Sequence, residues 1–457
     1  MINLHLGQRL AVKIERMGIN GEGIGYFKRR LIFVAYGLPD EELTVEITEN
    51  QRNFSRARIV TIDKKSSDRV EPADRAYAEL SESHIMHLAY DKQLAFKRDV
   101  IRQALYRYKP RGYQGYELRE TLAADKQLAY RNKLQFQIRK LKNGRVIAGL
   151  YKENSHHLVS LTACQVENSE NQALINEITR QIENLRLPVY DERKIMGIRT
   201  VVIRRAEFSG QIQVTFVLSK ELHLETLVEN LTKKFPAMTN VFVNIHPRKS
   251  SEIFGEKTFV LWRNELAKDT ITERVSGNEF ELSPRAFFQL NTAQAEKLYA
   301  EVVRALAPTK QDRVIDAYCG VGTIGFAVAK KVKSVHGMDI IPEAINDARD
   351  NARALGFKNC HYEIGKAEVV IANMFKSGHK PTALIVDPPR TGLDDALLDA
   401  LVKNPPAKMV YVSCNASTLA KDLVALTDVY NVSYIQSVDM FPHTARVEAV
   451  VKLEARK

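Results

Sequence analysis

The sequence contains few cysteines, one tryptophan and no long apolar run. Its four cysteines, Cys164, Cys319, Cys360 and Cys414, lie far apart and form no C-x-x-C pair. Neither a disulfide framework nor a zinc site is indicated, and reduced thiols favour a cytoplasmic location. No stretch approaches the roughly 20 apolar residues of a membrane-spanning helix, and the first residues lack a signal-peptide pattern. We therefore expect neither membrane association nor secretion.

Positive charge is unevenly distributed along the chain, whose formal net charge is +12. Residues 311–457 are nearly neutral, with 18 Lys+Arg against 17 Asp+Glu, whereas residues 1–310 hold 49 against 38. A solvated surface explains many charge excesses. A basic region joined to a neutral one is, however, typical of a platform that binds a polyanion beside a catalytic unit. Nothing in the sequence indicates a protein partner, so we expect a monomer.

Residues 1–65 predict a small β-barrel. Turn residues separate five short runs typical of strands, at Leu10–Arg16, Gly23–Phe27, Leu31–Ala35, Leu43–Thr48 and Ala57–Ile62. Five strands in so short a segment indicate a closed barrel of the OB type, which often binds oligonucleotides. Around Phe54 lie three arginines, Arg52, Arg56 and Arg58. This mixture suits phosphate contact and base stacking, and it equally fits a solvated strand edge.

The middle of the chain predicts an α+β domain that binds RNA. An amphipathic helix is expected over Lys92–Tyr108. Two hairpins, marked by Asn143-Gly144 and Ser209-Gly210, alternate with helices over Asn168–Leu185 and Leu222–Phe235. We assign residues 66–90 and 110–265 to this central domain, and residues 91–109 and 266–457 to a catalytic domain.

From about Thr309 strands and helices alternate. Strands are expected at Arg313–Ala317, Ser334–Met338, Ala383–Val386 and Met409–Val412, with helices between them. This alternation indicates a doubly wound, mostly parallel sheet, so the fold class is α/β with a Rossmann-like C-terminal domain.

A glycine-rich segment follows the first of these strands. Residues 316–325 contain G-x-G-x-x-G, at Gly320, Gly322 and Gly325, directly before a helix. Such glycines allow a tight turn and a close approach to a ligand. Asp339 ends the next strand, where a carboxylate can accept hydrogen bonds from ribose hydroxyls. The pattern fits a dinucleotide or S-adenosylmethionine, and a plain structural turn is the alternative.

The segment Asp387-Pro388-Pro389-Arg390 follows the strand Ala383–Val386. It lies at the carboxyl end of the strand, where ligands bind in open α/β sheets. Two prolines remove two backbone donors and stiffen the loop that presents Asp387. A turn-forming Asp-Pro is the simpler interpretation. Hydride transfer has no evident use for this segment, which therefore favours S-adenosylmethionine over a nicotinamide cofactor.

A cysteine lies at the end of another strand. Cys414 follows Val410–Ser413 and precedes the helix-favouring Ser417–Leu426. Most free cysteines are inert core residues, but near a helix N-terminus the thiolate is favoured. A thiolate added to C6 of a pyrimidine makes C5 nucleophilic toward an electrophilic methyl group, and a base must then remove the C5 proton. Cys414 and Glu448 supply these two groups.

Four motifs together resemble those of the RNA uracil-5-methyltransferases. They are S-P-R-A-F-F-Q-L-N at 283–291, D-P-P-R at 387–390, S-C-N at 413–415 and F-P-H-T at 441–444. The N-terminal barrel looks like a TRAM domain, and with it the chain is similar to the 23S ribosomal RNA branch along nearly its whole length. Transfer-RNA members resemble only the later part and lack the barrel. The resemblance implies methylation of uridine at carbon 5 in 23S ribosomal RNA, with S-adenosyl-L-methionine as cofactor.

The resemblance also implies roles for individual residues. Cys414 is expected to be the nucleophile and Glu448 the base. The expected cofactor site contains Gln289, Tyr318, Thr323, Asp339 and Asp387, beside the glycines Gly320 and Gly322. Gln289 and Asp387 are also expected to contact the uracil. Phe287 is expected near the target base, where its ring could occupy the place of a flipped nucleotide, with core packing as the alternative.

One departure from the family pattern is plain. Several ribosomal members hold an iron–sulfur cluster with three cysteines near the barrel and a fourth later in the chain. Alignment through His87-Leu88 places Asp74, Leu80 and Ser83 at the first three positions, and only Cys164 matches. One thiolate cannot hold a cluster that needs four, so we expect none.

Three other functions remain open from the sequence. Transfer RNA is the nearest alternative substrate. A non-catalytic RNA-binding or ribosome assembly factor could use the same basic platform, but it would need neither Cys414 nor Glu448. An NAD-dependent oxidoreductase would explain the glycines and Asp339, but not the D-P-P-R segment beside a cysteine.

Overall fold

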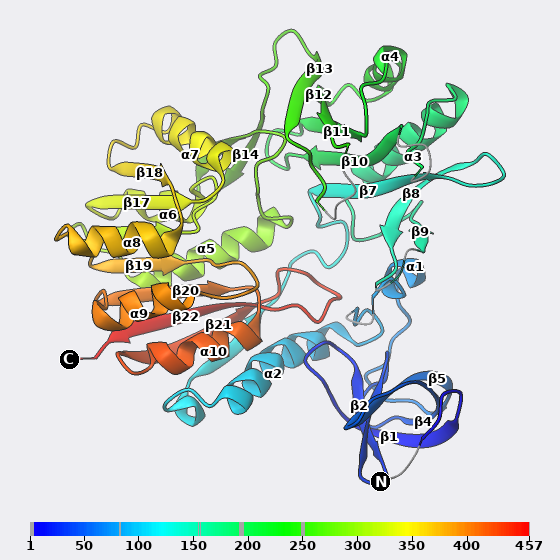
Figure 1. Ribbon diagram of the computed structural model, residues 1–457, viewed down its shortest axis with the longest axis horizontal. Coiled ribbons are helices and arrows are strands. Elements are labelled where there is room, and N and C mark those ends of the chain that lie inside the picture. Colours follow the sequence, from blue (N-terminus) through cyan, green and yellow to red (C-terminus); the bar gives the residue numbers. More distant parts are fainter. Residues whose placement is uncertain are drawn as a thin grey trace.

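The computed structural model describes residues 4–81, 84–153, 155, 157–191, 196–247 and 252–456. Figure 1 shows a barrel at the N-terminus, a central unit built on a seven-stranded sheet, and a C-terminal unit built on an eight-stranded sheet. In this described part, no helix has the length and apolar character needed to cross a bilayer.

The barrel closes in the order β1-β2-β3-β5-β4. Its strands are β1 (Arg9–Met17), β2 (Gly23–Phe27), β3 (Arg30–Val34), β4 (Glu42–Asn50) and β5 (Phe54–Lys64). Alternate residues of β1, Leu10, Val12 and Ile14, point into its core because side chains alternate between the two faces of a strand. The expected five-stranded barrel is confirmed.

The central unit is a mixed sheet ordered β13-β12-β11-β10-β7-β8-β9. Its strands are β7 (Lys133–Lys140), β8 (Val146–Tyr151), β9 (Leu158–Ser160), β10 (Ile198–Arg205), β11 (Ile212–Leu218), β12 (Met238–Ile245) and β13 (Lys257–Arg263). Apolar residues of α3 (Ser169–Asn184) and α4 (Glu225–Lys234) share its core. The short α1 (Arg75–Ala78) joins the same core through Tyr77.

The C-terminal sheet is ordered β18-β17-β16-β19-β20-β22-β21-β6. Its strands are β16 (Arg313–Ala317), β17 (Ser334–Asp339), β18 (Cys360–Ile364), β19 (Ala383–Val386), β20 (Lys408–Ser413), β21 (Tyr430–Val438), β22 (Glu448–Ala455) and β6 (Leu118–Leu122). Neighbours from β18 to β20 pair in parallel, while β22 is antiparallel to both β20 and β21. The predicted doubly wound, mostly parallel sheet is confirmed.

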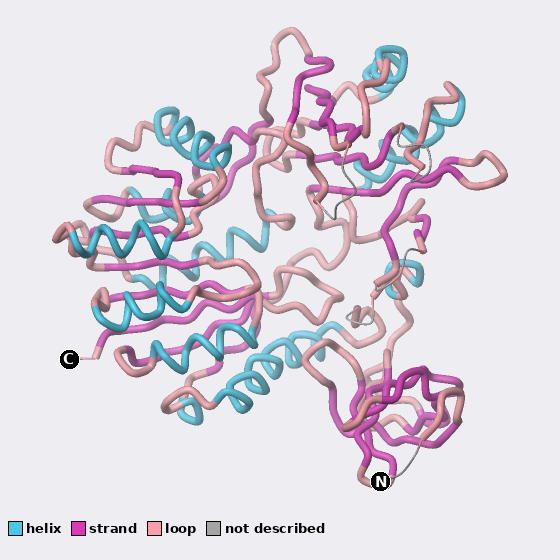
Figure 2. The backbone as a smooth tube through the Cα atoms, viewed as in Figure 1, coloured by secondary structure: helices cyan, strands magenta, loops and turns pink. Residues whose placement is uncertain are grey.

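Helices cover both faces of this sheet, as Figure 2 shows. One core contains residues of α5 (Thr292–Leu306), α6 (Thr323–Ala329) and α7 (Pro342–Ala354). The other contains residues of α2 (Tyr90–Tyr108), α8 (Ala367–Lys376), α9 (Asp395–Lys403) and α10 (Ala416–Leu426). A hairpin of β14 (Ile271–Val275) and β15 (Asn278–Leu282) leads from the central unit into α5.

The C-terminal unit is discontinuous in sequence. α2 shares a core with the C-terminal sheet. β6 pairs in parallel with β21 and forms the edge of that sheet, although the sequence had placed residues 110–265 together in the central domain. The local pattern of β6 could not reveal this, because its pairing partner lies more than 300 residues later.

Candidate active site

The pairing of β20 with β22 brings Cys414 and Glu448 together. β20 ends at Ser413, and the antiparallel β22 begins at Glu448, at the same edge of the sheet. Ser413 is paired with Ala449. Cys414, the residue after β20, and Glu448, the first residue of β22, therefore lie beside each other. Both line one cavity of about 880 Å³.

Most of the predicted site residues line this cavity. Besides Cys414 and Glu448, it is lined by Phe287, Gln289, Tyr318, Gly320, Asp339 and Asp387. They come from the loop before α5 and from the carboxyl ends of β16, β17 and β19. The carboxyl ends of parallel strands are the usual place for a ligand in such a sheet.

The loop after β16 is shaped to approach a ligand. Tyr318 and Gly320 adopt φ of 63° and 53°, and a Cβ added to Gly320 would meet nothing within 4 Å. Asp339 accepts hydrogen bonds from the backbone N–H groups of Gly320 and Ile341, at 3.1 and 2.9 Å. This carboxylate is thus fixed at the cavity wall. The loop, Asp339 and the cavity volume fit an adenosine-containing cofactor.

Gly322 and Thr323 lie deeper, and neither is among the described residues that line the cavity. A Cβ on Gly322, whose φ is 85°, would come within 2.7 Å of both Phe326 and the Tyr362 hydroxyl. The buried Thr323 hydroxyl donates to the Tyr299 hydroxyl at 3.1 Å. In this structure both residues support the loop from behind.

Three acidic groups share the inner part of the cavity. Burial raises the pKa of Asp387 to about 7. Burial and then the charge of Asp387 raise the pKa of Glu448 to about 8. Burial, Glu448 and Asp387 together raise the pKa of the Cys414 thiol to about 11. The expected preference for a thiolate near the α10 N-terminus is therefore wrong, because burial and two carboxyl groups outweigh it.

The loop at 283–291 is held by the central unit. Asn132 donates from its side chain to the Gln289 carbonyl at 2.8 Å and from its backbone to the Leu290 carbonyl at 2.9 Å. The buried Arg204 guanidinium donates to the Ser283 and Ala286 carbonyls. The Phe287 side chain at the tip is 63% exposed. Core packing is thus not the role of Phe287.

Cys414 also lines a second cavity, of about 720 Å³, which reaches the barrel. Phe54 and Arg56 of β5 line its far side. The Arg56 guanidinium lies 5.9 Å from the centroid of the Phe54 ring. Arg390 and Arg446 line both cavities, as Cys414 does, so two guanidinium groups share both cavity walls with this thiol.

Sequence reasoning missed two residues of this region. Arg446 lies two positions before Glu448 and carried no motif of its own. Lys97 lies on the buried stripe of α2, with Gln93, Phe96 and Val100 at helical spacing. A lysine and a glutamine on an otherwise apolar stripe were the available signal.

Two known families match most of the chain. Residues 89–456 match the family described as tRNA (Uracil-5-)-methyltransferase, and residues 4–60 match the TRAM domain. The chain belongs to the RNA uracil-5-methyltransferase family. A relative from Lactococcus lactis, named an uncharacterized RNA methyltransferase, is 62% identical over 100% of this chain and 93% of its own length. One from Streptococcus agalactiae, with the same description, is 54% identical over 100% of both chains.

A solved structure supports the same family at the level of fold. The Pyrococcus abyssi tRNA (uracil-54, C5)-methyltransferase, in complex with S-adenosyl-L-homocysteine, aligns with a TM-score of 0.76 and 27% identity over 97% of this chain and 100% of its own. The unaligned 3% is much shorter than the TRAM match at residues 4–60. The expectation that transfer-RNA methyltransferases lack the barrel is therefore wrong for this relative, and the barrel does not separate the two substrates.

The positions that hold an iron–sulfur cluster in several ribosomal uracil-5-methyltransferases do not fit one here. The Asp74 carboxylate accepts hydrogen bonds from the backbone N–H groups of Tyr77 and Gln165, at 2.9 and 3.0 Å. Leu80 is buried and offers no donor atom. Ser83 lies outside the described residues. The Cys164 thiol is buried, and burial raises its pKa to about 12.

We expect the protein to purify without bound iron, even when oxygen is excluded throughout. A cluster needs four ligands, usually thiolates, and one buried thiol with a high pKa cannot supply them. Iron and acid-labile sulfide assays on anaerobically purified protein check this. Stoichiometric iron and sulfide would show that other residues hold a cluster.

Proposed function

We propose that the protein methylates uridine at carbon 5 in 23S ribosomal RNA through a covalent intermediate. The observation that carries this proposal is that Cys414 and Glu448 lie beside each other in one cavity, and that Cys414 also lines a second cavity that reaches the barrel. A nucleophile for C6 and a base for the C5 proton are the two groups that this chemistry requires.

The larger cavity is the proposed site of S-adenosylmethionine. The main chain at Tyr318 and Gly320, the carboxylate of Asp339, and the side chains of Gln289 and Asp387 are placed to hold it. Gly322 and Thr323 then act by supporting this loop. S-adenosylmethionine, when bound, supplies an electrophilic methyl group. Asp387 and Gln289 line the same cavity as Cys414 and are proposed to orient the uracil as well.

Cys414 starts the proposed reaction. Its sulfur bonds to C6 of uracil, and the thiol proton leaves to solvent through the cavity on the barrel side. Since the pKa of the thiol is about 11, little thiolate exists at neutral pH, and proton loss accompanies the attack. Electron density moves to C5, which becomes nucleophilic.

Glu448 completes the reaction. Once C5 carries the methyl group, the Glu448 carboxylate takes the C5 proton, the C5–C6 double bond forms again, and the C6–sulfur bond breaks. A base with a pKa near the working pH is well matched to this task, and burial brings the pKa of Glu448 to about 8. The elimination releases Cys414 as a thiolate, which regains a proton from solvent, and Glu448 gives up the C5 proton to solvent before the next turnover.

The second cavity is the proposed path of the RNA strand. Phe54 offers a ring for base stacking, and Arg56, Arg390 and Arg446 offer positive charge along the way to Cys414. Phe287, exposed at the other cavity, is proposed to stack in the place of the flipped uridine.

Two RNA substrates remain as candidates. The motif resemblance favours 23S ribosomal RNA, and with it a cytoplasmic location. Transfer RNA is the second candidate, because the Pyrococcus abyssi relative is named for a transfer-RNA uridine. Incubation of each RNA with labelled cofactor, followed by mapping of the methylated nucleotides, tests the choice. Label in transfer RNA alone would overturn the ribosomal assignment.

Removal of Arg56 is expected to weaken RNA binding and its salt dependence. Each lost phosphate contact lowers the slope of log affinity against log salt by roughly 0.7 to 0.9. Arg56→Ala should show this change while cofactor affinity stays constant. Lys64→Ala is the matched control, since it removes a positive charge from the same strand outside the cavity. Equal slopes for wild type and Arg56→Ala would exclude Arg56 from the RNA path.

A further inference from the structure

A buried lysine lies behind the catalytic base. Lys97 is on the packed face of α2, and its side chain is 0% exposed, as is that of Asp439, with which it forms an ion pair. Its ammonium group also donates to the Phe441 carbonyl at 2.9 Å. Asp439 accepts a second hydrogen bond, from the Tyr90 hydroxyl at 2.7 Å. This buried pair therefore has several hydrogen bonds.

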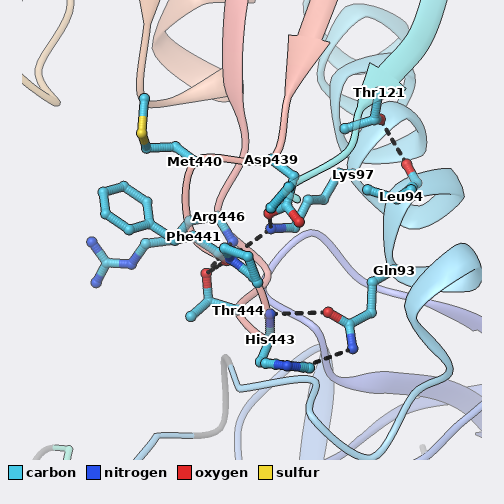
Figure 3. A network of polar contacts seen from close by, with 12 residues as sticks. Gln93, Leu94, Lys97, Thr121, Asp439, Met440, Phe441, His443, Thr444 and Arg446 are labelled. Atoms are coloured by element: carbon cyan, nitrogen blue, oxygen red, sulfur yellow. Dashed lines mark hydrogen bonds and ion pairs between the residues drawn. The ribbon is translucent and has the colours of Figure 1, made fainter. Parts of the chain in front are cut away.

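Residues of α2 hold the loop that precedes β22, as Figure 3 shows for Gln93 and Lys97. This segment, residues 439–447, connects β21 to β22. Gln93 accepts from the His443 backbone N–H at 3.0 Å, and its amide contacts the His443 ring at 3.2 Å. The Ile85 N–H donates to the His443 carbonyl at 2.9 Å. The start of β22, and so Glu448, is thus held from outside its own sheet.

Stability does not explain why a lysine is used here. Burying two charges costs free energy that their attraction only partly returns, and apolar residues of similar size often stabilise a core equally well. α2 could pack through Phe96 and Val100 without a charge. What an apolar residue cannot supply is a positive charge near Glu448.

We propose that Lys97 is a positioning residue for Glu448, which fixes the 439–447 loop and supplies a buried positive charge to it. This inference rests on the proposed role of Glu448 as the base. Burial and the charge of Asp387 oppose ionisation of Glu448, whereas the charges of Arg390 and Lys97 favour it. The charge of Glu448 in turn helps burial to raise the pKa of the Cys414 thiol in the same cavity.

Several titratable groups surround Lys97. Asp439 is its counterion and also accepts from the Tyr90 hydroxyl, and the charge of Lys97 acts on His443 and on Glu448. Burial lowers the pKa of His443 to about 4, so this ring is neutral at physiological pH. Without Lys97, only Arg390 would counter burial and Asp387, and the pKa of Glu448 would rise further.

The test follows the release of the covalent intermediate, because this step no longer depends on the thiol proton of Cys414. Adduct formed with a uridine-containing 23S ribosomal RNA fragment is chased, and its decay is measured from about pH 6 to about pH 10. In Lys97→Met, the pH at which the rate of adduct decay rises should move upward by roughly one unit. The decay rate should then be about tenfold lower than that of the wild type at pH 7 and should recover at alkaline pH. Lys97→Arg should keep the wild-type profile.

Two further variants separate charge from folding. Lys97→Met/Asp439→Asn removes both buried charges and leaves Tyr90 a partner, so it should fold and show the same alkaline shift. Lys92→Met removes a lysine from the exposed side of α2 and should leave the pH profile of adduct decay unchanged. If the rate of adduct decay fell by the same factor at every pH in both variants that carry Lys97→Met, the proposal would be overturned. Unimpaired release by Glu448→Gln would instead overturn the proposed function.

Discussion

Cys414→Ala is expected to abolish methylation while leaving S-adenosylmethionine affinity nearly unchanged. The thiol acts on the uracil ring, and C5 is not nucleophilic until sulfur has added to C6. Loss of a catalytic nucleophile commonly lowers turnover by roughly 10⁴-fold or more. Cofactor binding should persist because Tyr318, Gly320 and Asp339 form the opposite part of the cavity. Transfer of labelled methyl groups and calorimetric titration of the cofactor measure the two effects.

Cys360→Ala is the matched control for this experiment. It removes a buried thiol of β18, and Cys360 is not among the described residues that line either cavity. Turnover should stay close to that of the wild type. If Cys414→Ala also turned over normally, Cys414 would have no part in the reaction.

Glu448→Gln is expected to trap the protein on methylated RNA. The amide cannot accept the C5 proton, so Cys414 can add to C6 and the base can become methylated, but the thiolate cannot leave. The enzyme should therefore accumulate as a slowly migrating covalent band on a denaturing gel, and the RNA in that band should contain the labelled methyl group. Multiple turnover should be lost.

Two controls give this result its meaning. The double variant Cys414→Ala/Glu448→Gln should show no band, because the sulfur that forms the bond is gone. Glu454→Gln changes a half-exposed carboxylate on the same strand and should turn over normally. A Glu448→Gln enzyme with the wild-type rate and no band would mean that another group removes the proton.

The alternating part of the fold was predictable because its signals are local. The strands at Arg313–Ala317 and Ala383–Val386 were predicted at their observed bounds, and each is a short apolar run followed by a turn motif. The glycine-rich segment then placed Gly320 and Asp339 at one edge of the sheet. The topology alone predicts a ligand site at the carboxyl ends of these strands.

The register of distant strands was not predictable in this way. β22 runs against β20, and only that pairing places Glu448 beside Cys414. No local pattern in either strand specifies the partner. The upward pKa shift of Cys414 was missed for the same reason, since it arises first from burial in the folded structure and then from Glu448 and Asp387, which are distant in sequence. Lys97 and β6 are likewise long-range contributions to the site and the sheet.

The placement of α2 and β6 has a consequence for synthesis of the chain. Both leave the ribosome well before β21 and β22. α2 packs on that part of the sheet, and β6 pairs with β21. By contrast, the strands of the barrel lie close together in sequence, and so do those of the central sheet. These two units can fold first. The catalytic unit must wait for its last strand, and until then Lys97 has no Asp439 to pair with. A transcript that ends early therefore yields a protein with RNA-binding surfaces and an exposed, unpaired sheet edge, which is prone to aggregate.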